Sequence, residues 1–351
     1  MLHRKTIVPM KRDRLHSRRS RFTPRRGRWS RGWQITIAIL LTACSTNGED
    51  VLWILPPIES ADHQASSTID RTDGDLASSS GASVGSEGPD GSWYTRPIQQ
   101  AVGRIESFDR ESCRWTGQDG RTRTLPANRV LTFRHRSEDP EAATLVEALD
   151  RDDFDAAFAA LPAALRTRPP IHAQQDWVMR VARLAWASGR FGGAESLIKQ
   201  LDVRPLPPCV VALLPLVWVP TDDATTMTRL RSVLAPDDDL DSPLVRLLRA
   251  SALVYSGRSA SAVEVLAPLR RHGTREEVRV LATWLSVAAQ TPQDFRGHAD
   301  VWIRNLSHTP VVLGDGPRRL MIHRLAGVGR ESEAERLAVI DRYAWANVPP
   351  P

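Results

Sequence analysis

The sequence predicts a mainly α protein in which a helix–turn–helix repeat solenoid follows a small four-stranded β meander. Three C-terminal stretches that share one residue pattern predict the solenoid, and four short β-prone stretches before them predict the meander. A third feature, an apolar run after a basic leader, predicts export. The expected divisions are a leader with an export signal (1–43), a disordered tether (44–92), the β unit (93–136) and the array (137–345).

The leader accounts for the positive net charge of the chain. Residues 1–43 hold 12 of the 47 Lys and Arg residues and one of the 41 acidic residues, so the remainder has 35 basic and 40 acidic residues, a net charge of −5. A nucleic-acid-binding face needs a basic surplus on the folded part. We therefore expect no nucleic-acid partner, and a cytoplasmic protein that binds nucleic acid through its leader is the least favoured hypothesis.

The run ITIAILLTAC, Ile35–Cys44, ends the leader. It is too short to span a bilayer, which takes about 20 apolar residues, and a basic stretch followed by 7–15 apolar residues is typical of an export signal. Leu41–Cys44 resembles the bacterial lipobox, which implies lipidation of Cys44 and anchoring in the cell envelope on the periplasmic side. A cleaved signal with a chance cysteine, or a twin-arginine signal at Ser17–Phe22, are the alternatives.

The segment after this cysteine has the composition of a flexible linker. Glu59–Ser92 is rich in Ser, Gly, Asp and Ala, cannot bury enough apolar surface to offset its ordering entropy, and as a coil would span roughly 30 Å. Asp70, Asp73 and Asp75 lack the spacing of a calcium loop. The stretch VLWILPPI, Val51–Ile58, could lie on the membrane or dock on the folded part, and both possibilities stay open.

Four stretches between residues 101 and 135 predict the β unit: AVGRIESF, SCRWTG, RTRTLP and RVLTFRH. Asp119–Gly120 predicts a two-residue hairpin in which both residues take positive φ, and alternation places Cys113 and Trp115 on one face. A small SH3-like barrel is one form of such a unit. Its arginines alternate with apolar residues, which favours a solvated outer face over a binding surface; they are Arg104, Arg114, Arg121 and Arg123.

The repeated pattern predicts the array. GRFGGAESL (Gly189–Leu197), GRSASAVEV (Gly257–Val265) and GRESEAERL (Gly329–Leu337) each have Gly-Arg, then Ala five places after the Gly. The glycines are 68 and 72 residues apart, about twice the 34-residue period of a helix–turn–helix repeat. A glycine ends the first helix of each pair in a left-handed conformation, and the alanine lets two helices approach closely. Degraded units are expected at Asp152–Ala157, Asp222–Leu230 and Gln293–Trp302.

This pattern resembles the tetratricopeptide family in the Gly, the Ala and the aromatic residue three places before the Ala, here Phe154 and Phe191. The resemblance covers about residues 140–343 and departs from the family where Pro215 interrupts a first helix. Cys209–Val219, almost wholly apolar, is expected to be a buried helix. An unrelated stack of α-hairpins is the alternative.

The resemblance also implies a partner-binding face on the first helix of each pair, because members of the family bind extended peptides there. The residues expected on or near this face are Asp176, Arg183, Trp186, Tyr255 and His323. The Lys and Asn set with which some members clamp a peptide carboxylate is absent, since Lys199 is the one lysine of the array and falls on a second helix. The resemblance therefore implies a protein or peptide partner but not a free carboxylate.

No catalytic, cofactor-binding or metal-binding pattern is recognisable. The nine histidines are scattered without a His-x-x-x-His pair, and Cys113 and Cys209 either form a disulfide or stay as buried thiols. We therefore expect no cofactor and no metal. The favoured function is that of a non-enzymatic protein, tethered to the membrane by a lipid, that binds another envelope protein or peptide; an envelope enzyme or enzyme accessory with a site between the β unit and the array is the alternative. The sequence does not predict an oligomeric state.

Overall fold

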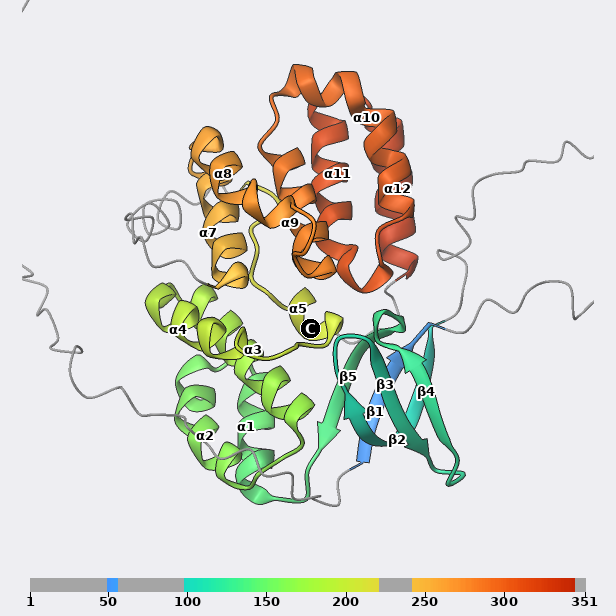
Figure 1. The fold of residues 1–351 in the computed structure, drawn as a ribbon, viewed down its shortest axis with the longest axis vertical. Helices are drawn as coiled ribbons and strands as arrows, with labels where there is room; N and C mark the ends of the chain where they lie inside the picture. Colours follow the sequence, from blue (N-terminus) through green and yellow to red (C-terminus); the bar gives the residue numbers. More distant parts are fainter. Residues whose placement is uncertain (1–48, 56–97, 221–241, 345–351) are drawn as a thin grey trace, which may run out of the picture. The chain divides into compact units, whose positions relative to one another are not determined.

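The computed structural model describes residues 49–55, 98–220 and 242–344 (Figure 1). These residues form a small antiparallel sheet and a series of helices, so the mainly α prediction with a small β unit is confirmed. The leader, Cys44 and the expected degraded unit at Asp222–Leu230 lie outside the described residues.

The sheet has five strands rather than the predicted four. They are β1 (Glu49–Ile54), β2 (Gln99–Phe108), β3 (Ser112–Gly117), β4 (Thr122–Pro126) and β5 (Val130–Arg136). The spatial order is β4-β3-β2-β1-β5, with every neighbouring pair antiparallel. The four expected strands are present, but they do not form a meander, because β1 lies between β2 and β5 (Figure 1).

Strand β1 corrects the expected boundary of the tether. It belongs to the segment 44–92, yet its side chains enter the core, with Leu52 fully buried and Val51 and Ile54 nearly so. Ile54 is paired with Gln99 at the start of β2. Of the two possibilities for Val51–Ile58, docking on the folded part is therefore the one observed for its first four residues. Residues 56–97 connect two adjacent strands of one sheet.

The hairpin between β3 and β4 agrees with the sequence in position and differs in detail. Gly120 has a φ of 72°, as the Asp-Gly signal requires. Asp119 keeps a negative φ and instead accepts a hydrogen bond from the backbone N–H of Arg121 (3.1 Å). Cys113 and Trp115 are buried on one face as predicted, and the four arginines of the unit are exposed.

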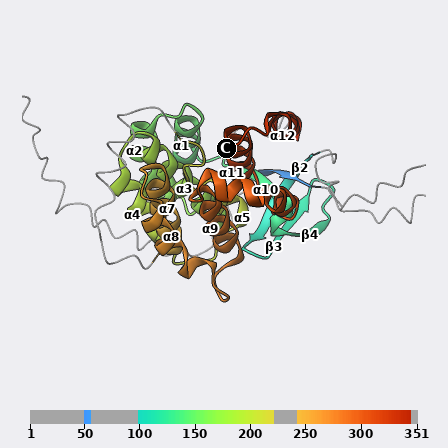
Figure 2. The same cartoon turned by 90° about the horizontal axis from the view of Figure 1, so that it is seen from above.

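The helices follow the sheet as antiparallel hairpins (Figures 1 and 2). The pairs are α1 (Pro140–Asp150) with α2 (Phe154–Arg166), α3 (Ile171–Ala187) with α4 (Phe191–Leu201), α7 (Pro243–Tyr255) with α8 (Ser259–Leu266), and α11 (Asp315–Gly327) with α12 (Glu331–Ala344). Between the last two pairs lie α9 (Glu276–Ala288), which packs on α7, and α10 (Pro292–Ser307), which packs on α11. Lys199 lies on α4, a second helix, as expected.

The turns of four hairpins share one backbone conformation and one hydrogen-bond pattern. Gly189, Gly257 and Gly329 have φ values of 74°, 81° and 80°. In the first turn the Gly189 N–H donates to the Trp186 carbonyl (2.9 Å) and the next N–H donates to a carbonyl five residues back (2.8 Å), which is the Schellman pattern. Both bonds recur at the other two glycines, and at Asp152, whose φ is 53°. The predicted unit at Asp152–Ala157 therefore forms a hairpin without a glycine.

The apolar stretch Cys209–Val219 is not the buried helix that the sequence predicted. Only α5 (Pro208–Ala212) is helical, and the chain then continues without regular structure to Pro220. Pro215 has no backbone N–H and restricts the residue before it, so the helix ends early. Cys209 and Cys113 are both buried, and within the described residues neither forms a disulfide, so of the two alternatives the free thiols are observed.

Helical segments pack against β5, the strand at one edge of the sheet. Strand β5 packs against α5 and the short helix η5 (Val311–Leu313), and four consecutive residues, Val130 to Phe133, are buried. Arg110, in the turn between β2 and β3, pairs with the buried Glu277 of α9 (3.2 Å). The sheet is thus joined to α5 and η5 through β5, and to α9 through Arg110.

Candidate metal centre

The five residues expected on a partner-binding face differ in exposure. Asp176 and Trp186 are buried: Asp176 pairs with Arg180 (2.8 Å), and the Trp186 ring packs edge-on against a phenylalanine of α4 (4.6 Å). Tyr255 is half-buried, and its hydroxyl donates to the Trp218 carbonyl. Arg183 is half-buried and His323 exposed. The resemblance missed the burial of α3, which packs against α1, α2, α4 and α5.

The buried residues hold a constellation that the sequence analysis did not find. Asp50 of β1, His135 of β5 and His172 in the first turn of α3 lie together, and one possible ligand atom from each falls within 4.8 Å of the others. Their side chains are 1%, 1% and 3% exposed. The cluster therefore lies inside the protein, where two strands of the sheet meet the first turn of α3.

The two oxygens of Asp50 have different partners. Oδ2 accepts the backbone N–H of Ile105 on β2 (2.7 Å). Oδ1 lies 2.7 Å from Nδ1 of His135 and 3.8 Å from Nε2 of His172. Burial alone would raise the pKa of Asp50, but the hydrogen bond from His135 and the nearby His172 outweigh it and lower that pKa to about 2. Asp50 is therefore a carboxylate at neutral pH.

Each histidine has one buried nitrogen without a hydrogen-bond partner. These atoms are Nε2 of His135 and Nε2 of His172. An unsatisfied buried polar atom costs about 1–3 kcal/mol, which makes such atoms rare in folded proteins. Nε2 of His172 lies 3.8 Å from Oδ1 of Asp50, too far for a hydrogen bond and close enough for both atoms to contact one further group between them.

Aromatic rings enclose the histidines and fix their orientation. The Phe133 ring lies edge-on to His172 (centroids 5.4 Å apart), and Trp177 of α3 lies 5.9 Å from His135. The two imidazoles are nearly perpendicular, with centroids 6.2 Å apart. This apolar wall excludes bulk water and strengthens any electrostatic interaction inside it.

A small cavity adjoins the cluster on the side of His135. Its volume is about 30 Å³, and Arg134, Asp176, Trp177 and Arg180 also line it. This is room for one or two water molecules and no more. Burial raises the pKa of Asp176 even though the neighbouring Arg180 acts in the opposite direction.

Two imidazoles and a carboxylate are a ligand set for a divalent transition metal. Sequence reasoning missed this set because its members stand at positions 50, 135 and 172, with no local spacing to reveal them. The one available signal was an acidic residue directly before an apolar stretch, which is too common to identify a site.

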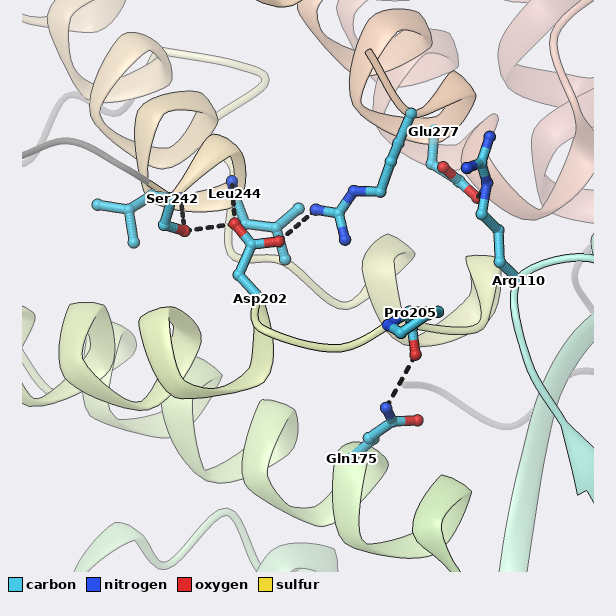
Figure 3. A network of polar contacts seen from close by, with 9 residues as sticks. Arg110, Gln175, Asp202, Pro205, Ser242, Leu244 and Glu277 are labelled. Atoms are coloured by element: carbon cyan, nitrogen blue, oxygen red, sulfur yellow. Dashed lines mark hydrogen bonds and ion pairs between the residues drawn. The ribbon is translucent and has the colours of Figure 1, made fainter. Parts of the chain in front are cut away.

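A second polar network lies among the helices and is structural. Asp202, directly after α4, accepts hydrogen bonds from the Ser242 hydroxyl (2.5 Å) and the Leu244 N–H (3.1 Å) and pairs with Arg275 before α9 (Figure 3). Gln175 donates to the Pro205 carbonyl in the same region (3.0 Å). These contacts hold neighbouring helices together, and each of them is made with another residue of the protein.

Comparison of the chain with known protein families, with curated protein sequences and with solved structures finds no match in any of the three. Among the described residues, no helix is both long and apolar enough to cross a membrane. Cys44, the expected lipidation site, is outside those residues.

Proposed function

We propose that the protein is a non-enzymatic protein of the bacterial cell envelope that binds another envelope protein or peptide through its helical array. The α-hairpins, with the Gly-Arg turn and the buried alanine recurring at Ala194, Ala262 and Ala334, support a tetratricopeptide-like solenoid. In such arrays each hairpin leaves an apolar face that its neighbour covers, and the last unit needs a polar outer face.

The observation that carries this proposal lies on α12, the last described helix. Leu337, Ala338, Val339 and Ile340 are four consecutive apolar residues, none of which is fully buried, and the Val339 side chain is 50% exposed. Val339 thus presents an exposed apolar side chain on the outer helix of the array, where a partner can cover it. A terminal helix with such a run supports a protein-binding end of the array.

Photo-crosslinking in the host cell tests this surface. A photoreactive amino acid replaces Val339 in one variant and Val203, which is 82% exposed in the loop after α4, in the control. We expect a discrete crosslinked species from position 339 that is absent at position 203. No discrete species from position 339, or the same species from both positions, would contradict a binding surface on α12.

The position of β1 changes how an anchor at Cys44 would work. Strand β1 begins at Glu49, five residues after Cys44, so an extended connection reaches at most about 18 Å. We propose that the lipid holds the sheet close to the membrane surface, because β1 comes before residues 56–97 in the chain and those residues therefore do not separate the fold from the anchor. Intact mass of the protein from its host decides: a chain that starts at Cys44 with added acyl mass supports the anchor, and an unprocessed N-terminus rejects it.

One observation favours an envelope enzyme as a second candidate. The Asp50, His135 and His172 cluster lies where the sheet meets α3, as a site between the β unit and the array requires. The cavity beside it has room for water only, so a substrate could enter only after a local opening. Turnover of a small substrate that is lost in Asp50→Asn and kept in His323→Asn would favour this candidate over the first.

A further inference from the structure

We propose that Asp50, His135 and His172 bind one divalent transition-metal ion of the zinc type, which fastens the sheet to the helical array. The proposal is independent of the interaction surface on α12. It depends on three features of the cluster: the chemistry of its atoms, the distances between them, and the buried Nε2 of His172, which has no hydrogen-bond partner.

The ligand chemistry selects the class of metal. Neutral imidazole nitrogens prefer Zn²⁺ and other first-row transition metals, whereas Mg²⁺ and Ca²⁺ prefer oxygen ligands throughout. Two histidines with one carboxylate therefore favour zinc, commonly with a water as fourth ligand.

The distances require only small movements. Ligand atoms about 2.1 Å from a tetrahedral ion stand about 3.4 Å from one another. Oδ1 of Asp50 is 2.7 Å from Nδ1 of His135 and 3.8 Å from Nε2 of His172. Binding thus displaces the proton between Asp50 and His135, lengthens that pair by about 0.7 Å and shortens the pair of Asp50 and His172 by about 0.4 Å; the ligand atoms of the two histidines lie within 4.8 Å of each other.

The backbone positions of the three ligands are already fixed. Asp50 is paired with strands on both sides, opposite Gly103 of β2 and His135 of β5. Its Oδ2 is held by the Ile105 N–H (2.7 Å), a contact that orients the carboxylate as the outer partners of metal ligands do. His172 stands in the first turn of α3, so the ion would join two strands to a helix.

Because the cluster is buried, the ion has to enter while the chain folds or opens, and metal binding is coupled to folding. The unmodified full-length chain is therefore unfolded in denaturant that contains a chelator and then refolded in the presence of ZnCl₂ or CoCl₂. A desalting column removes the metal that is not bound. We expect one Zn²⁺ retained per chain, a melting temperature that rises with free Zn²⁺, and visible absorption bands of four-coordinate Co²⁺.

Matched variants locate the ion. Asp50→Asn keeps an acceptor for the Ile105 N–H, and His172→Gln keeps an amide in place of the ring; each should lower zinc affinity by about 100-fold or more. His323→Gln alters an exposed histidine on α11 and should bind as the unmodified chain does. Equal binding in His172→Gln and the unmodified chain would mean that the ion lies elsewhere and would overturn the proposal.

The cobalt spectrum keeps the proposal testable if a variant does not fold, as far-UV circular dichroism would reveal. It needs only the unmodified chain. Bands of four-coordinate Co²⁺ that disappear on addition of Zn²⁺ support the site. A spectrum of hydrated Co²⁺ only, with no Zn²⁺ retained after desalting, means that the cluster is a hydrogen-bonded group without a metal, and the proposal fails.

Discussion

Replacing Asp202 should destabilise the array more than any other single change to its polar contacts. The Asp202 side chain is 3% exposed and lies between three elements. It caps the start of α7 through the Ser242 hydroxyl and the Leu244 N–H, and it pairs with Arg275 at the start of α9 (Figure 3). Asp202→Ala removes all three contacts and leaves a backbone donor and a guanidinium without their acceptor.

The magnitude follows from the number and burial of these contacts. A hydrogen bond to a charged group contributes about 1.5–3 kcal/mol, and the loss of one partner of a buried ion pair costs about 3–5 kcal/mol. The Arg275 side chain is 22% exposed, so solvent weakens its ion pair with Asp202, and we place the cost of losing that pair at the lower end of this range. We expect Asp202→Ala to lower the free energy of unfolding by about 4 kcal/mol and Arg275→Ala, which leaves the two α7 contacts intact, by about 1–2 kcal/mol.

Urea unfolding followed by far-UV circular dichroism measures both values, and Asp202→Asn, which keeps an acceptor but no charge, should fall between them. The reasoning fails if Asp202→Ala lowers the free energy of unfolding by less than 1 kcal/mol. It also fails if Arg275→Ala is as destabilising as Asp202→Ala, because the contacts of Asp202 with the Ser242 hydroxyl and the Leu244 N–H would then contribute nothing.

Three further predictions test other parts of the fold. Leu52 is a fully buried residue of β1, and Leu52→Ala should lower the free energy of unfolding by about 3–4 kcal/mol in urea titration. No change in that free energy would mean that β1 is not part of the core. Gly257 has a φ of 81°, so Gly257→Ala should lower the free energy of unfolding by about 1–2 kcal/mol. Gly192 is exposed within α4, and Gly192→Ala should raise that free energy by about 0.5–1 kcal/mol. If both variants shift the melting temperature in the same direction, the left-handed turn at Gly257 is rejected. Burial and nearby carboxylates raise the pKa of Cys113 to about 12, and burial raises the pKa of Cys209. Both should therefore stay thiols at pH 8 and react with iodoacetamide about 1,000-fold more slowly in the native state than in denaturant. Rapid labelling in the native state would contradict their burial.

The hairpins could be predicted from the sequence because their turns are local. A left-handed residue closes each repeated turn, and glycine adopts that conformation without steric cost. The turn at Asp152 was still recognisable from the residues that follow it, Phe154 and the buried Ala157. The α9–α10 connection has no left-handed residue, and this is why that unit matched the pattern poorly.

Strand β1 and the metal centre could not be predicted, because both depend on contacts between residues far apart in the sequence. Glu49 is paired with Arg136, 87 positions later, and a six-residue strand between a leader and a linker offers no hairpin signal. Two of the ligands, Asp50 and His172, are further apart still, with 122 positions between them. The burial of Asp176 and Trp186 likewise depends on how helices pack around α3, which a repeat pattern does not specify.

The central place of β1 decides which fragments of this protein can be handled in solution. A fragment that begins at residue 93, after the linker, lacks the strand between β2 and β5. Both of those strands would then expose an unpaired row of backbone donors and acceptors, which is a template for aggregation, and the same cut removes Asp50. A soluble fragment therefore has to include Glu49–Ile54, and a peptide with that sequence, added to the shorter fragment, should restore its solubility by filling the gap in the sheet.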